Sequence, residues 1–338
     1  MAQFHIRSGF RVLQRIAGVD RRSLETSELA YPHRQMFFGI VMGLLASASW
    51  AAANVFVQKS GQQAGAFRAL VWAQVVGIVA LAPIAWILDV PTGSWTRHTV
   101  LWAVLAAVAA VVAYACLFFS MERGRLSVVV PVMSSWSLVA AGVSIFVLGE
   151  RLRLAHGLGA GLVVLGVLIV SRFSQVEASP DSAVAKGSVP DNDHGVPADR
   201  QHRIAMIASV GAALGFGVLI PAIDQLAPVT GRLGTIPLVY LMDLVLGIPL
   251  VLMARIDIRF PPRASWVAII AAGVFETIGF VWIALGVARA PVAIVSPLAG
   301  LASAFTVLFA WVVLRERPRP AVLLGAAMAC TGVVTLAI

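Results

Sequence analysis

Charged residues are scarce in this chain of 338 residues. Aspartate, glutamate, lysine and arginine make up 12% of the sequence and apolar residues 59%, whereas a soluble domain carries about 25% charged residues. About 20 apolar residues cross a hydrocarbon core roughly 30 Å thick. We therefore predict an all-α polytopic membrane protein with ten transmembrane helices and disfavour a soluble helix bundle. The stretches that lack charged residues have the length of membrane spans. There are ten of them, each 18 to 25 residues long, eight uncharged and two interrupted by one acid: 35–58, 69–88, 98–121, 126–149, 154–171, 204–223, 233–254, 264–288, 290–314 and 320–338.

The residues that catalytic and metal sites need are also few or unsuitably placed. The two cysteines, Cys116 and Cys330, both lie inside apolar stretches, where we interpret them as small core residues and not as a disulfide or metal pair. None of the six histidines lies mid-span with an acid or a serine, which leaves no material for a zinc site or a Ser/His pair. A Gly-Lys-Ser/Thr element for ATP is also missing. We therefore predict no enzyme, no metal and no cofactor.

Basic residues exceed acidic ones, but their placement does not indicate nucleic-acid binding. The net charge is +9, and the arginines lie in short loops and in the tail 1–35, which is ordinary for a polytopic membrane protein. The tail has no apolar stretch of signal-peptide length, so we expect no cleaved leader. Ile6, Phe10 and Leu13 follow helical spacing and would suit a short interfacial helix, with a flexible basic tail as the alternative.

The sequence repeats itself at a fixed offset of 166 residues. The segment VLGERLRLAHGLGAGLVVLGV at 147–167 is matched by VLRERPRPAVLLGAAMACTGV at 313–333. Over 123–167 against 289–333, 15 of 45 ungapped positions are identical. Such self-similarity indicates a duplicated structural unit.

The repeat predicts the organisation of the chain. We expect a tail (1–35), a first five-helix unit (36–172), a polar linker (173–202) and a second five-helix unit (203–338). Because each unit has an odd number of helices, the second starts on the opposite side of the membrane. Inverted repeats of this kind are typical of secondary transporters, whose binding site lies near the midplane between the halves.

Two five-helix units that each end in a Glu-Arg step and a glycine-rich last helix resemble the EamA-type branch of the drug/metabolite transporter superfamily. The segments that carry the resemblance are PVMSSWSLVAAGVSIFVLGERLRLAHGLGAGLVVLGV at 131–167 and PLAGLASAFTVLFAWVVLRERPRPAVLLGAAMACTGV at 297–333. The resemblance covers Met36 to Ile338 and implies ten helices and transport of a small solute. The second unit departs from the family's Gly-Glu step, because Arg315 precedes Glu316.

The repeated motif residues are interpreted as structural. Glu150 and Glu316, followed by Arg151 and Arg317, are expected in turns where each carboxylate faces the free N–H groups of the helix that follows it. We interpret the glycines in GLGAGLVVLG as helix-packing positions and not as a dinucleotide loop, with Gly157 and Gly161 forming a small-xxx-small face.

Two repeated prolines are placed at helix starts. Pro131 and Pro297 are predicted in the first turns of their helices. The alternative is a discontinuous helix that exposes backbone to a cavity.

Two acids are the chemically informative residues of the sequence. Asp243 is the eleventh residue of its apolar stretch and Glu276 the thirteenth, so both are predicted at mid-bilayer, where an acid costs at least a few kcal/mol. Their partners in the first unit, Gly77 and Ala110, are uncharged. We interpret the acids as protonatable or cation-binding groups of a central cavity, with interhelical hydrogen bonding as the alternative. Further candidates for the cavity wall are Tyr240, Asn54, Gln74, Ser135, Trp136 and Trp282.

These observations together predict a secondary transporter that moves a small metabolite or drug-like solute across the cell membrane by alternating access. Protons are the candidate coupling ion, with Glu276 ranked above Asp243. The predicted partners are the solute, protons and the lipid bilayer, with no nucleic acid. A membrane channel, a flippase for a lipid-linked substrate and a non-catalytic membrane protein are the alternatives.

Overall fold

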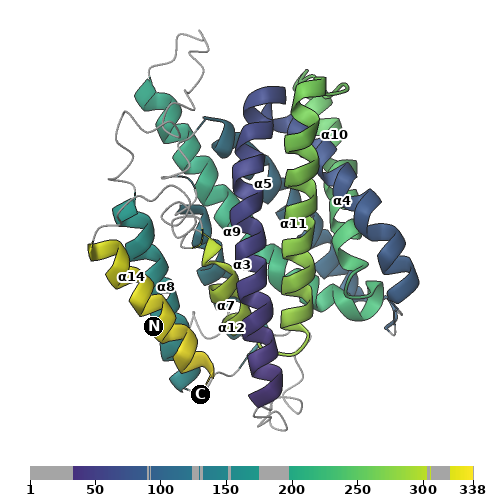
Figure 1. Ribbon diagram of the computed structural model, residues 1–338. Helices are drawn as coiled ribbons and strands as arrows, with labels where there is room; N and C mark the ends of the chain where they lie inside the picture. Colours follow the sequence, from purple (N-terminus) through teal and green to yellow (C-terminus); the bar gives the residue numbers. More distant parts are fainter. Residues whose placement is uncertain are drawn as a thin grey trace, which may run out of the picture.

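The computed structural model describes residues 33–89, 91, 93–123, 129, 132–150, 154–174, 198–302, 305 and 320–337. This part of the chain is built of helices and contains no strand (Figure 1). In chain order they are α3 (His33–Ala64), α4 (Ala66–Leu88), α5 (Arg97–Arg123), α7 (Trp136–Phe146), α8 (Leu154–Ser174), α9 (Ala198–Thr230), α10 (Thr235–Met253), the 3-10 turn η1 (Arg263–Ser265), α11 (Trp266–Val287), α12 (Val292–Ala299) and α14 (Pro320–Ala337).

The helices confirm a multi-pass membrane protein. Hydrocarbon offers the backbone no hydrogen-bond partner, so a spanning segment satisfies its N–H and C=O groups within a helix. Two shorter apolar helices occupy 132–146 and 154–166. The predicted count of ten spans stays a prediction. Within the described part, six helices are long and apolar enough to cross a membrane: Arg34–Ala64, Ala66–Leu88, Arg97–Arg123, Arg203–Thr230, Thr235–Met253 and Arg263–Val287.

Helices extend into both ends of the predicted linker. Helix α8 continues to Ser174 and α9 begins at Ala198, so residues at both ends of 173–202 belong to helices. Residues 1–32 and 175–197 lie outside the described residues, and with them the predicted interfacial helix and most of the linker.

The last helices of the two units pack against each other through the repeated glycines. A β-carbon added to Gly166 would lie 2.5 Å from the carbonyl oxygen of Gly325, and one added to Gly332 would lie 2.6 Å from that of Gly159. An early residue of α8 therefore meets a late residue of α14 and the reverse, so the two helices run antiparallel, side by side in Figure 1. Small residues allow this close approach of two backbones.

The predicted Gly157–Gly161 packing face is wrong. Both glycines are exposed, and an added β-carbon at either meets no described atom within 4 Å. The packing stripe is formed by Gly159 and Gly166 instead, seven residues apart on one face of α8. The repeat itself carries the correct signal, because these two glycines recur in the second unit and the other two do not.

Contacts between the two units come in pairs that the 166-residue offset relates. Gln74 of α4 donates a hydrogen bond to Asp243 of α10. The equivalent residues of the other unit are Tyr240 for Gln74 and Gly77 for Asp243, and these two are also in contact. Helix α3 packs along α11, and α5 along α9, as the same exchange requires. The turn after the first helix of each unit also repeats, because Gly65 and its partner Gly231 both have positive φ, 87° and 80°.

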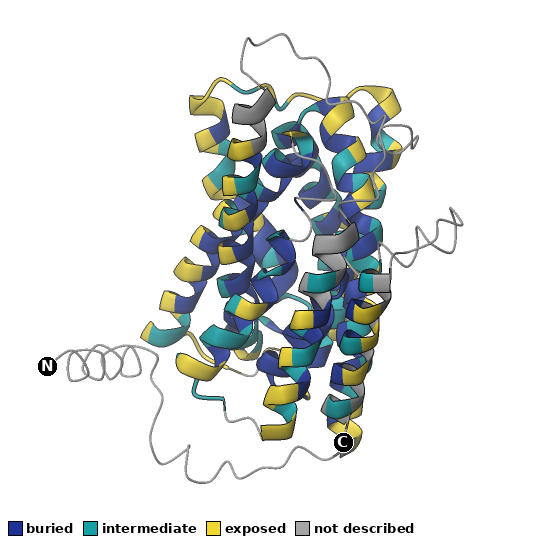
Figure 2. Cartoon of the chain, turned by 90° about the vertical axis from the view of Figure 1, so that its left-hand side faces the viewer, coloured by how far each residue is buried: buried dark blue, intermediate teal, exposed yellow. Residues whose placement is uncertain are grey.

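The buried residues lie on the inner faces of the helices and the exposed residues on the outer faces. Figure 2 shows buried residues along the inward helix faces and exposed ones on the outer faces. Large apolar side chains on the outside include Trp86, Leu154 and Met253, each more than 80% exposed. Such a surface would be abnormal in water and is what a lipid-facing surface requires.

Candidate functional site

The fourth helix of each unit is interrupted at the same place in the repeat. Residues 132–134 are helical, Ser135 forms a turn, and α7 begins at Trp136. In the second unit α12 ends at Ala299 and a turn at 300–301 follows. Positions 135 and 301 are related by the offset of 166. Interrupted helices of this kind expose backbone groups in the middle of transporters.

Pro297 was predicted at the start of its helix. It is instead the sixth residue of α12, which begins at Val292 after Pro291. The prediction erred because Pro291 comes directly before the helix and allows it to start five residues earlier, at Val292. Its repeat partner Pro131 lies outside the described residues.

The two interrupted helices meet where they break. A β-carbon added to Gly300 would lie 2.7 Å from the hydroxyl oxygen of Ser137. The hydroxyl of Ser137 donates to the carbonyl of Ser134 over 3.1 Å, and that of Ser135 donates to the carbonyl of Val132 over 2.6 Å. Ser135 therefore bonds its own helix and is not among the lining residues of the two cavities described below.

A cavity of about 40 Å³ lies between the two units. A space of this size admits water. Helices of both units form its wall, which is mainly aromatic and apolar. The lining residues are Trp50 and Asn54 of α3, Leu117 of α5, Met133, Ser134 and Trp136 around the first interruption, Phe216 and Ile220 of α9, Glu276 and Phe280 of α11, and Ala302.

Glu276 is the charged residue of this lining. Its backbone carbonyl accepts a hydrogen bond of 3.3 Å from the Trp50 indole, while no described residue hydrogen-bonds to its carboxylate. The neighbouring glycines admit other helices, because a β-carbon at Gly273 would meet the backbone of Ala73 and one at Gly279 the Trp50 ring. The glycines thus bring α3 and α4 close, and Glu276 faces the remaining space.

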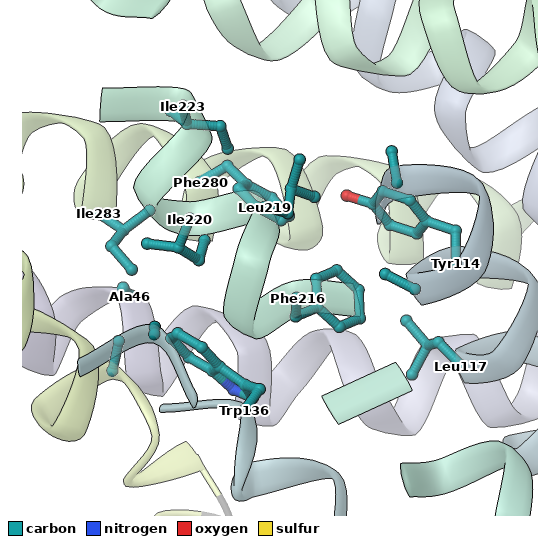
Figure 3. Packing of buried hydrophobic residues seen from close by; sticks show 14 of the residues in the cluster. Ala46, Tyr114, Leu117, Trp136, Phe216, Leu219, Ile220, Ile223, Phe280 and Ile283 are labelled. Atoms are coloured by element: carbon teal, nitrogen blue, oxygen red, sulfur yellow. The ribbon is translucent and has the colours of Figure 1, made fainter. Parts of the chain in front are cut away.

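Aromatic rings form part of the lining of the central cavity, and Figure 3 shows those of Trp136, Phe216 and Phe280 in the buried core, with Tyr114 close by. The ring centroids of Trp50 and Trp136 are 5.5 Å apart, and those of Trp50 and Phe280 5.1 Å. Tyr114 and Tyr240 lie beyond Phe280, with centroids 5.8 Å from each other. These edge-to-face contacts fix the ring orientations and form a wall of aromatic groups that runs from the cavity to Tyr240 of α10.

Asp243 lies beyond this wall, in a second cavity. This groove of about 230 Å³ lies between α4, α5 and α10. Gln74 donates a hydrogen bond to the Asp243 carboxylate, and both residues are buried. Placing Asp243 and Gln74 in the same wall as Glu276 is therefore wrong. The interhelical hydrogen bond, the predicted alternative, describes Asp243 but not Glu276.

The remaining predicted residues divide between wall and core. Asn54 and Trp136 line the central cavity with Glu276. Tyr240 lies between the two cavities and accepts a hydrogen bond of 3.4 Å from the Thr277 hydroxyl. Trp282 is half-buried against the hydrophobic core and lines neither cavity.

Sequence reasoning missed most of the apolar lining, including Phe216, Phe280 and Leu117. Nothing distinguishes these residues in a single apolar stretch. Tyr114 had a signal, because it is one of three tyrosines in the chain and lies inside an uncharged stretch.

At one end of the molecule, where α9 ends, hydrogen bonds join the two units. The backbone N–H of Gly93 donates to the Pro228 carbonyl over 2.7 Å, and the Asp89 carboxylate accepts from the Gly234 N–H over 2.6 Å. The hydrophobic core contains large apolar side chains that are fully buried, among them Leu219, Ile223, Ile283, Ile294 and Leu298.

Glu150 also links the two units at this end of the molecule. Gly149 before it has a φ of 75°, which glycine adopts readily, and this turn directs the carboxylate onto α12. The two carboxylate oxygens accept hydrogen bonds of 3.0 Å from the backbone N–H groups of Val292 and Ala293. The prediction of a helix-terminal role named the wrong helix, since the bonds go to the second unit and not to the helix that follows. Arg151, Glu316 and Arg317 lie outside the described residues.

Removing the Glu150 side chain should destabilise the protein. Glu150→Ala leaves two N–H groups at the start of α12 without acceptors, which costs about 0.5–2 kcal/mol. We expect a lower thermal unfolding temperature in detergent and unchanged solute affinity in the protein that remains folded. Loss of solute binding at full stability would instead place Glu150 in the binding site.

Glu150 should also make stability depend on pH. Burial raises the pKa of its carboxyl group to about 7, against the lowering effect of the two N–H bonds. The folded state therefore holds a proton that the unfolded state has released, so this contribution to stability is complete below about pH 4.5 and is lost as pH rises through 7. Glu150→Gln, which cannot ionise, should flatten the fall in unfolding temperature between pH 5 and pH 8. An equal fall in both proteins would contradict this.

Comparison with known families identifies the chain. The model of the EamA-like transporter family matches residues 37–172 and, a second time, residues 203–338. The chain belongs to the EamA-like transporter family. The resemblance seen in the motifs is thereby confirmed, as is the assignment to multi-pass membrane transport proteins.

Two further likenesses bear on the architecture of this EamA-like protein. An uncharacterized protein of Methanocaldococcus jannaschii is 26% identical over 133 residues, which are 39% of this chain and 95% of the relative. That relative is therefore about as long as one of the two units. A solved crystal structure aligns with a TM-score of 0.64 at 18% identity, over 88% of this chain and 95% of that one, which shows a shared fold.

Proposed function

We propose that this EamA-like protein is a secondary transporter that exchanges protons for a small solute through the cavity around Glu276. The observation that carries the proposal is the position of this acid. It lies in a cavity bounded by helices of both units, and its carboxylate has no hydrogen-bond partner among the described residues. An acid at mid-membrane without a hydrogen-bond partner costs free energy of folding, and such residues generally have a functional role.

The proposed architecture is ten spans in two inverted units. Antiparallel packing of α8 with α14, and contacts that exchange under the 166-residue offset, support the inversion. A relative about as long as one unit supports duplication. In such transporters the halves rock about a site between them.

The small central cavity fits one step of this cycle. About 40 Å³ is too little for a metabolite, since ligand pockets generally measure about 300–1,000 Å³. The contacts of Asp89, Gly93 and Glu150 with the second unit close one end. We interpret this conformation as one in which cargo has left and the closed end must separate before cargo enters from that side.

Transport by purified protein tests the proposal. A solute library is first screened by thermal shift in detergent, and the hits are then assayed as labelled solutes in proteoliposomes. We expect uptake that saturates with solute concentration and that an imposed pH gradient accelerates at least tenfold. Flux that does not saturate would indicate a channel, and saturable flux indifferent to the gradient would remove proton coupling.

A further inference from the structure

The groove between α4, α5 and α10 is the larger of the two cavities, at about 230 Å³. Its lining on α4 runs from Phe67 to Gln74, and on α10 from Asp243 to Ala254. Because α4 begins and α10 ends at the same end of the molecule, the groove extends from that end to mid-membrane. Its two polar side chains, Gln74 and Asp243, lie at the inner end, and the rest of the wall is apolar.

The polar pair leaves two acceptor atoms unused. Gln74 and Asp243 are 3% and 4% exposed, and the amide nitrogen of Gln74 donates to Oδ2 of Asp243. Oε1 of Gln74 has no hydrogen-bond partner within the described part of the chain. Oδ1 of Asp243 lies 3.7 Å from the position of a β-carbon on Gly247, which also lines the groove. A buried acceptor without a donor, such as Oε1 of Gln74, costs about 1–3 kcal/mol.

No basic side chain of the described residues forms an ion pair with the Asp243 carboxylate. The ion pairs found there are Arg68 with Asp257 and Arg123 with Glu122. Free acceptor oxygens beside an unpaired carboxylate favour a donor with positive charge. An ammonium group has three N–H donors and no acceptor, so it can bond both free oxygens, and charge-assisted hydrogen bonds of this kind are the strong ones.

We propose that this groove is a binding site for an apolar molecule that carries one protonated amine. The ammonium group bonds Asp243 and Oε1 of Gln74, and the hydrocarbon lies along the apolar wall formed by Leu70, Val71 and Val251. A space of 230 Å³ approaches the lower end of the range of ligand pockets, about 300–1,000 Å³, which suits a small organic molecule. Leu250, on the same wall, is 56% exposed, so such a molecule can enter from the lipid side.

This site is separate from the cavity around Glu276. The aromatic wall with Tyr114 and Tyr240 lies between them, and no residue lines both. The repeat-related position has no such polar pair. The residue equivalent to Asp243 is Gly77 and the residue equivalent to Gln74 is Tyr240, whose ring contacts that glycine. The groove proposal stands whether or not the central cavity transports protons.

Binding of n-octylammonium to the purified full-length protein tests the proposal, with 1-octanol as an uncharged probe of equal length. Calorimetric titration in detergent at pH 7 should show saturable binding of octylammonium and at least tenfold weaker binding of octanol. Asp243→Asn keeps the shape of the side chain and should weaken octylammonium at least tenfold. Glu276→Gln should leave the affinity unchanged.

A second variant tests the groove without altering its charge. Gly247→Leu fills the space, since its β-carbon would meet a described atom no closer than 3.7 Å, and it should abolish octylammonium binding. Gly161→Leu, at an exposed glycine of α8, is the matched control and should bind normally. Equal binding of octanol and octylammonium, unaffected by Asp243→Asn, would show a groove for lipid chains and overturn the proposal. Loss of octylammonium in Glu276→Gln alone would place the amine in the central cavity and overturn it as well.

Discussion

Replacing Glu276 by glutamine is expected to abolish solute uptake driven by a pH gradient while the protein still folds. Glutamine has the shape of the protonated acid but cannot release a proton. The carboxylate has no hydrogen-bond partner among the described residues, so the substitution breaks no contact that holds the helices together. We expect at least a tenfold fall in gradient-driven uptake into proteoliposomes, with the unfolding temperature unchanged or raised, because a buried charge is removed.

Two controls separate coupling from binding. Exchange of labelled for unlabelled solute without a gradient needs no net proton movement, so Glu276→Gln should retain it. Asp243→Asn should impair gradient-driven uptake less, because Asp243 lies in the other cavity and is bonded to Gln74. If Glu276→Gln transports with the pH dependence of the unaltered protein, its carboxylate is structural and the coupling proposal fails, while family membership is unaffected.

Membrane character and duplication could be read from the sequence because each leaves a periodic trace. Spans show as gaps between charges, and the repeat shows as matched residues at one offset. The interruption at Ser135 and Gly300 left a weaker trace. Serine and glycine are tolerated inside membrane helices, and the break is set by the crossing of two helices from different units, which no single stretch reveals.

The candidate site could be predicted only in part, for a similar reason. An acid in an apolar stretch is conspicuous, so Glu276 and Asp243 could both be found, but depth in the membrane does not say which face of the bundle a residue occupies. The two acids have nearly equal positions within their apolar stretches, and yet they line different cavities. Glu150 illustrates the same limit, since its local position predicts a helix terminus and the fold decides which one.

The sharpest structural prediction concerns single methyl groups on α8 and α14. Gly166→Ala would place a β-carbon 2.5 Å from the Gly325 carbonyl oxygen and 2.6 Å from the Ala329 nitrogen. Both are backbone atoms, which cannot turn aside as a side chain does, so the helices must separate. Such overpacking costs about 1–3 kcal/mol. Gly332→Ala meets the Gly159 backbone at 2.6 Å and should behave alike, and the two changes together should prevent recovery of folded protein.

Gly157→Ala and Gly161→Ala provide the matched controls within the same helix. Their β-carbons meet no described atom within 4 Å, and alanine is the better helix former by about 1 kcal/mol, so both should leave the unfolding temperature unchanged or raise it. Yield and thermal unfolding in detergent would be measured for all four single variants. If Gly161→Ala destabilised the protein and Gly166→Ala did not, the packing face would be the one that the GLGAG spacing predicts. The antiparallel contact of α8 with α14, and with it the chief support for inverted units, would then be wrong.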